Sequence, residues 1–153
     1  MDEIDYNENF RERTKKLALG IISELTQIKY SVESSVIKKQ IIRSATSVAA
    51  NYRAVCRARS NKERYAKICI VVEEIDETVF WLELLNDLKL LPIEKINKLQ
   101  EEAEEILRAT SSYKNKLSKS YNAKKLHHPS LITHHLSLIT YHPSPITHKL
   151  LTK

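Results

Sequence analysis

The clearest indication of fold class comes from residues 34–59, with the sequence SSVIKKQIIRSATSVAANYRAVCRAR, and from the SNKE that follows at residues 60–63. Apolar side chains recur there at steps of three and four residues, the period of an amphipathic helix. The buried face of this helix is predicted to comprise Ile37, Ile41, Ala45, Val48, Tyr52 and Val55. SNKE has the pattern of a capping box, in which Ser60 accepts a hydrogen bond from the Glu63 amide and Glu63 reaches back. We therefore expect one helix to end near Arg59 and the next to begin immediately.

The same periodicity predicts three more helical segments around this one. A first helix is expected from about Asn9 to Ile28, the third continues to about Lys89, and a fourth runs from Pro92 to about Ser118. The seam of the third helix is predicted to comprise Tyr65, Ile68, Val72, Ile75, Val79 and Leu82. Glycine and proline are almost absent before the C-terminal tail, which argues against a sheet. We predict an all-α protein, an antiparallel up-down-up-down four-helix bundle.

The bundle is assigned to residues 9–122, after an N-terminal extension of residues 1–8 and before a low-complexity tail of residues 123–153. Within residues 127–147 the tail reads HHPSLIT, HHLSLIT and YHPSPIT, and it holds all 6 histidines of the protein. We hypothesise that the reading frame enters a tandem DNA repeat of CATCACC and CATCACT units, whose successive copies encode His-His-Pro-Ser-Leu-Ile-Thr. Incidental metal affinity of the histidines is the alternative. Several prolines and no helical period predict a disordered tail.

The formal net charge of +6 is unevenly distributed along the chain. Residues 38–67 carry nine basic side chains against one acid, whereas residues 68–88 carry six acids and no base. The cations expected on the outer face of the second helix and around the following turn are Lys39, Arg43, Arg53, Arg57, Arg59, Lys62 and Arg64. A basic surface of this kind favours nucleic acid, RNA above all, as a partner, and a merely solvated face is the alternative.

The third helix carries a second apolar stripe opposite its core seam. The residues assigned to it, with the acids beside them, are Ile70, Glu74, Glu77, Trp81, Leu84 and Leu88. A helix with two apolar faces must bury both, so we predict that this stripe is an interface between identical subunits. The alternative is that Trp81 folds over the end of its own bundle.

Catalytic residues, metal sites and cofactors are not expected in the bundle. Every histidine lies in the tail, which excludes Glu-x-x-His metal pairs and a Cys-His dyad, and Gly20 alone cannot form a glycine-rich phosphate loop. No apolar run is long enough to span a bilayer, and the acidic residues 1–10 do not resemble a secretory signal. We therefore expect a non-enzymatic cytoplasmic protein with no membrane partner, in which Cys56 and Cys69 are buried thiols and not a disulfide.

From about Arg43 to Leu85, the chain resembles the four-helix-bundle proteins encoded by intervening sequences in bacterial 23S rRNA genes. The likeness is carried by IRSA at 42–45, SVAANYR at 47–53, CRARSNKE at 56–63 and EIDETVFWLELL at 74–85. It extends more weakly from Phe10 to Lys119. The resemblance implies a homopentamer with a basic surface. This family is also similar to the accessory variability determinant of diversity-generating retroelements, a pentamer that works with RNA and a reverse transcriptase. The resemblance therefore implies a reverse transcriptase or another protein as a further candidate partner.

Two functions are consistent with these features. The first is a nucleic-acid-binding module for structured RNA, which would bind by shape and charge because Tyr52 and Tyr65 fall on core stripes and are not available to stack on bases. The second is a structural oligomer or protein-binding adaptor, in which the basic face of the second helix meets the acidic face of the third helix on a neighbouring subunit. An open position for Arg53 and Arg57 favours the first function, and burial against Glu74 or Glu77 of another subunit favours the second.

Overall fold

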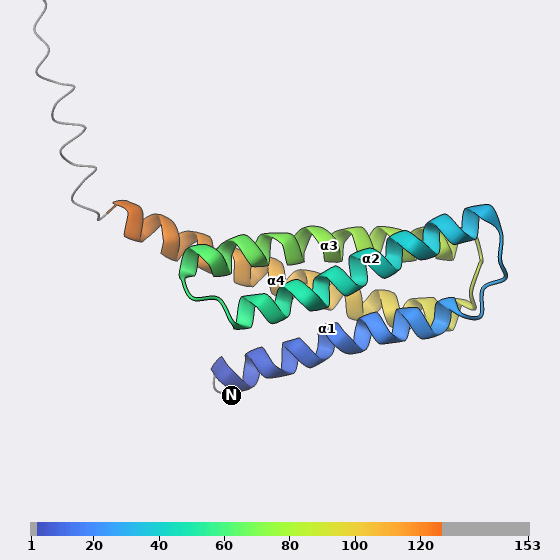
Figure 1. Ribbon diagram of the computed structural model, residues 1–153, viewed down its shortest axis with the longest axis horizontal. Helices are drawn as coiled ribbons and strands as arrows, with labels where there is room; N and C mark the ends of the chain where they lie inside the picture. Colours follow the sequence, from blue (N-terminus) through green and yellow to red (C-terminus); the bar gives the residue numbers. More distant parts are fainter. Residues whose placement is uncertain (1–2, 127–153) are drawn as a thin grey trace, which may run out of the picture. The chain divides into compact units, whose positions relative to one another are not determined.

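The computed structural model describes the backbone of residues 3–126 and the side chains of residues 7–120. It contains four helices, α1 (Glu3–Leu25), α2 (Val32–Cys56), α3 (Asn61–Asp87) and α4 (Ile93–Leu126), and no strand over this range. Successive helices run antiparallel and are joined by short connections (Figure 1). The structure therefore confirms the predicted all-α four-helix bundle.

By compactness the chain divides into two units, Met1–Tyr121 and Asn122–Lys153. The bundle belongs to the first unit, and only the end of α4 is described in the second. Residues 123–126, which were assigned to the tail, are the last residues of α4. The hypothesis of a translated repeat and the predicted disorder and metal affinity of residues 127–153 lie outside the described range. None of the described helices is both long enough and apolar enough to cross a membrane.

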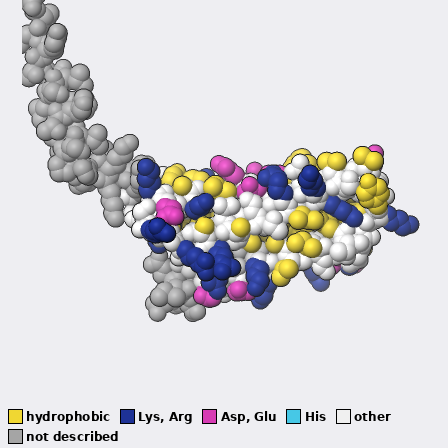
Figure 2. Space-filling view, in the orientation of Figure 1, with side chains coloured by type: hydrophobic (Ala, Val, Ile, Leu, Met, Phe, Trp, Pro, Cys, Tyr) yellow, Lys and Arg dark blue, Asp and Glu magenta, His cyan; other side chains and the backbone are white. Residues whose placement is uncertain are grey.

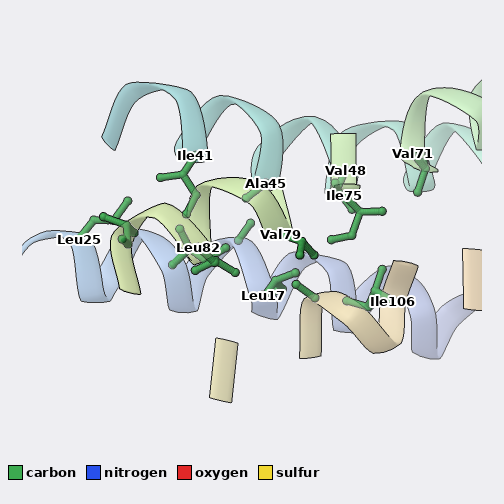
Figure 3. Close-up of a cluster of buried hydrophobic side chains, with 14 of the residues drawn as sticks. Leu17, Leu25, Ile41, Ala45, Val48, Val71, Ile75, Val79, Leu82 and Ile106 are labelled. Carbon is green, nitrogen blue, oxygen red and sulfur yellow. The ribbon is translucent and has the colours of Figure 1, made fainter. Parts of the chain in front are cut away.

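Side chains from all four helices meet in one hydrophobic core (Figure 3). Every residue of the predicted stripe on α2 is buried, from Ile37 to Val55, so that prediction is confirmed. The α3 seam differs from its prediction, because Val71 and Leu85 are fully buried whereas Tyr65 and Val72 are half-buried. Four predicted seam residues are buried, namely Ile68, Ile75, Val79 and Leu82. The structure reassigns the positions of Val71, Thr78 and Leu85 to the seam.

Thr78 occupies one of those reassigned positions, and its polarity concealed it from a search for apolar side chains. Its hydroxyl lies 3.0 Å from Ser44 Oγ and 2.8 Å from the Glu74 carbonyl oxygen, and the hydroxyl of Ser44 donates to the Ile41 carbonyl oxygen at 3.3 Å. A buried hydroxyl is tolerated when it is hydrogen-bonded in this way. Thr78 and Ser44 thus form a polar contact inside the α2–α3 seam.

Local capping or a turn accounts for the starts of α2 and α3 and for the end of α3. Ser31 caps α2 in a capping box with Ser34, and Ser60 caps α3 by accepting from the Glu63 amide at 3.1 Å. The Glu63 carboxylate accepts from the Arg59 amide at 3.0 Å, one residue before the predicted partner. Lys89 reverses the chain after α3 with a left-handed φ of 52°, a conformation more usual for glycine.

The two terminal helices are longer than predicted. α1 begins at Glu3 instead of Asn9, and α4 ends at Leu126 instead of Ser118. The predictions stopped where the buried stripes stop, but polar turns can continue a helix without burying a side chain. α1 and α4 are also joined directly, because Arg13 donates to both Glu102 carboxylate oxygens at 2.8 Å and to Glu105 at 2.7 Å.

Candidate nucleic-acid interface

The predicted basic residues lie on the surface but do not form one continuous cluster. Six of the seven are exposed and Arg64 is half-buried. Lys39 lies 14 residues before Arg53 on α2, a separation of about 21 Å along the helix axis. Lys39 and Arg43 therefore lie on a different part of α2 from Arg53 and Arg57.

Arg43 is already paired within its own chain. Its Nη2 atom lies 2.6 Å from Glu77 Oε2, and its Nη1 atom lies 3.6 Å from Glu74 Oε2 on the same helix, α3. Trp81 adds a donor, because its indole Nε1 lies 3.0 Å from Glu77 Oε1. The hydrogen bond from Arg43, followed by that from Trp81, lowers the pKa of Glu77, and the hydrogen bond to Glu77 raises the pKa of Arg43. This group, Arg43, Glu74, Glu77 and Trp81, is called the α2–α3 charge cluster below.

Arg53 and Arg57 occupy a different setting, on one side of a groove between α1 and α2. The α1–α2 groove is defined by the residues that line it, which are Arg11, Glu12, Lys15, Ala49, Ala50, Arg53 and Arg57. Figure 2 shows Lys and Arg side chains gathered near this end of the bundle, where α1 begins and α2 ends. The sequence analysis missed Arg11 and Lys15. Their four-residue spacing beside the α1 stripe was a signal that they share one face of the helix.

Carboxylates compensate the cations of the α1–α2 groove on one side only. On α1, Arg11 pairs with Glu8, and Lys15 Nζ lies 3.9 Å from Glu12. On α2, neither Arg53 nor Arg57 makes an ion pair or a side-chain hydrogen bond with any residue whose side chain is described. Among the side chains that the structure describes, the groove therefore presents four cations against two carboxylates, and the uncompensated charge lies on α2.

The groove ends near Cys56, the last residue of α2. The Cys56 thiol is half-buried and lies 3.8 Å from the Asn7 carbonyl oxygen of α1. Burial raises the pKa of the Cys56 thiol, and the positive charge of Arg11 opposes that shift. Cys56 and Cys69 are both free thiols in the structure, as predicted, but each is half-buried instead of buried.

The predicted apolar stripe on α3 is only partly open. Ile70, Trp81 and Leu84 are half-buried, and Trp81 and Leu84 pack against the bundle core, whereas Leu88 is 50% exposed. The sequence analysis overlooked Phe80, which is 52% exposed and stacks edge-on against Trp81 with ring centroids 4.9 Å apart. Of the two predicted acids, Glu77 and Glu74 both contact Arg43 of the same chain.

Comparisons with known proteins identify the relatives of the chain. A family model described as 23S rRNA-intervening sequence protein matches residues 8–112. Among the solved structures, one from Bacteroides thetaiotaomicron VPI-5482, described as a protein with unknown function from the S23 ribosomal protein family, superposes with a TM-score of 0.63 at 27% sequence identity. The alignment covers 71% of this chain and 97% of that one. No match was found among curated proteins.

Proposed function

The chain belongs to the family of 23S rRNA-intervening sequence proteins, and from this we propose that it is a non-enzymatic oligomeric bundle that binds structured RNA through its basic surface. The observation that carries the proposal is the open, uncompensated position of Arg53 and Arg57 in the α1–α2 groove. A cation without a carboxylate partner can bind a phosphate without first breaking an ion pair. Each such contact releases condensed counterions, and this release drives binding that does not depend on sequence.

The α2–α3 charge cluster supports this proposal over the adaptor alternative. In the adaptor, the acids of α3 would receive the basic face of α2 from a neighbouring subunit. Arg43 of the same chain already contacts both Glu74 and Glu77. Because those acids have an intramolecular partner, they are poorly suited to neutralise Arg53 and Arg57 of another subunit.

We propose further that the protein assembles into a closed ring of identical subunits, a pentamer as the family resemblance implies, through the exposed edge of α3. Phe80 and Leu88 are each about half exposed, and large apolar side chains in that state are buried favourably in a subunit contact. Phe80→Glu or Trp81→Glu should lower the solution mass measured by light scattering. A mass equal to that of the wild type in both variants would exclude this edge of α3 from the contact.

The proposed function is tested with the double variant Arg53→Glu, Arg57→Glu and a labelled RNA hairpin, by fluorescence anisotropy between about 50 and 200 mM salt. The wild-type protein should bind with an affinity that falls steeply with salt. The variant should bind more than tenfold more weakly and with a shallower salt slope, about equally for unrelated hairpins of one shape. Lys29→Glu, Lys98→Glu is the matched control, because both lysines are exposed and lie where α1 ends and α4 begins.

Light scattering on the same samples separates the two functions. Unchanged mass with weakened RNA binding supports the nucleic-acid proposal. The contrary result has two parts: the wild type forms no salt-dependent RNA complex, and the variant loses its oligomeric mass. That result would identify Arg53 and Arg57 as subunit contacts and overturn the proposal.

A further inference from the structure

We propose that the α1–α2 groove holds the phosphate backbone of an unpaired segment of RNA, with Arg53 and Arg57 on one wall and Arg11 and Lys15 on the other. This inference rests on the proposed function and adds to it the place where the strand lies and the kind of strand that fits. It also assigns a binding role to two α1 residues that the basic face of α2 does not include.

The spacing of the four cations suits a strand that runs along the groove. Arg53 and Arg57 are four residues apart on α2, and Arg11 and Lys15 are four residues apart on α1. Four residues of helix rise about 6 Å, which is close to the separation of successive phosphates in an extended strand. Each wall can therefore contact two consecutive phosphates.

The width of the groove favours one strand over two. The helices are in contact beneath it, where the Phe10 and Tyr52 rings have centroids 5.6 Å apart. Helices packed in this way have axes about 8–10 Å apart, so the space between their outer side chains is much narrower than a double helix. Ala49 and Ala50 line the groove and leave room for a strand between the cations. A duplex would contact only the rim.

The charges indicate how the strand enters. Arg53 and Arg57 are uncompensated and exposed, so they are available to the first phosphates. Arg11 and Lys15 pair with Glu8 and Glu12 across the surface of α1, and such exposed pairs are weak, so a phosphate can replace the carboxylates. Among the residues 7–120 whose side chains are described, none that lines the groove is aromatic, so these residues offer bases no stacking surface. Binding should therefore be nearly the same for oligouridine and oligothymidine.

The test uses the full chain and a labelled oligouridine of about ten nucleotides, within the usual range of single-strand site sizes. Arg11→Gln, Lys15→Gln should weaken binding about tenfold and should lower the slope of log affinity against log salt by about 1.4, because two phosphates of a single strand are no longer neutralised. The control variant Lys29→Gln, Lys98→Gln has the same change in charge, and it should leave the affinity and the salt slope unchanged. Glu8→Gln, Glu12→Gln should strengthen binding, because the phosphates no longer compete with carboxylates.

The outcomes distinguish this inference from the proposed function. If the wild type binds the RNA hairpin but not oligouridine, or if a blunt RNA duplex displaces oligouridine efficiently, the groove does not hold a single strand and the proposed function stands. The same conclusion follows if Arg11→Gln, Lys15→Gln binds oligouridine like the wild type. Failure of the wild type to bind any of these nucleic acids overturns both. Circular dichroism and solution mass, expected to be unchanged, verify that each variant is folded and assembled.

Discussion

Two regions of α2 carry exposed arginine, and they differ in what lies opposite. At Arg43 the neighbouring helix is α3, whose Glu74 and Glu77 receive the guanidinium. At Arg53 and Arg57 the neighbouring groove wall is α1, where Glu8 and Glu12 are already paired with Arg11 and Lys15. The first region is an ion-paired seam above a packed core, and the second is an open groove with excess positive charge.

The comparison shows that an exposed arginine can be either structural or available for a ligand, and that the facing helix determines which. A guanidinium paired with two carboxylates must give up those partners before it can bind a phosphate. A guanidinium that faces other cations gains from any anion that enters, because like charges no longer repel one another across the groove. Arg43 is therefore assigned to the stability of the bundle, and Arg53 and Arg57 to binding.

The largest difference between the two regions should appear in the free energy of unfolding when one side chain is replaced. Ile75 is fully buried in the α2–α3 seam, so Ile75→Ala should lower the free energy of unfolding by about 2–5 kcal/mol through reduced burial and a cavity. Ala50→Ser in the α1–α2 groove should change it by less than about 0.5 kcal/mol, because Ala50 is exposed. Urea unfolding followed by circular dichroism measures both. Equal effects at the two positions would show that the groove is packed like the seam.

A smaller effect is expected at the buried polar contact of the seam. Thr78→Val removes a hydroxyl while keeping a side chain of similar shape, and it leaves Ser44 Oγ without that partner, which should cost about 1–3 kcal/mol of unfolding free energy. Thr78→Val combined with Ser44→Ala should cost less than the sum of the two single changes, because each change already breaks their shared hydrogen bond. Strict additivity in the double-mutant cycle would show that Thr78 and Ser44 do not interact.

The smallest effect concerns the α2–α3 charge cluster and depends on pH. Hydrogen bonds from Arg43 and then from Trp81 lower the pKa of Glu77 in the folded chain. The ionised Glu77 side chain therefore contributes its full stabilisation above a pH of about 4.3, the pKa of a glutamate in the unfolded chain. This stabilisation is lost as the pH falls through the lowered folded value. Glu77→Gln should therefore reduce the melting temperature at pH 7 by a few degrees at most, and the difference from wild type should shrink near pH 3. A difference that grew on acidification would contradict the Arg43–Glu77 assignment.

Features of the fold that depend on residues close together in the sequence could be predicted, whereas features that depend on contacts between helices could not. The α2 stripe from Ile37 to Val55 and the cap at Ser60 are local in sequence, and both were predicted correctly. The choice of Val71 over Val72 in the α3 seam depends on the neighbours of α3 in space, so helical periodicity alone assigned it incorrectly.

The candidate interface was predictable only in part, for the same reason. Composition identified a basic face, but nothing in residues 38–67 shows that Arg43 meets acids of α3 while Arg53 meets cations of α1. Arg11 and Lys15 join the groove because α1 and α2 pack side by side, which is a tertiary relationship. Phe80 was overlooked because the larger Trp81 beside it was assigned to the stripe, whereas Phe80 is the more exposed of the two.

The central claim is that paired and open arginines on one helix have different roles, and the salt dependence of RNA binding tests it directly. Arg43→Gln and Arg53→Gln remove the same charge from the same helix. Arg53→Gln should lower the slope of log affinity against log salt by about 0.7–0.9 for each phosphate that Arg53 neutralises, and Arg43→Gln should leave the slope at its wild-type value. Equal slopes for the two variants, or a lower slope for Arg43→Gln alone, would contradict the assignment of the α1–α2 groove as the nucleic-acid interface.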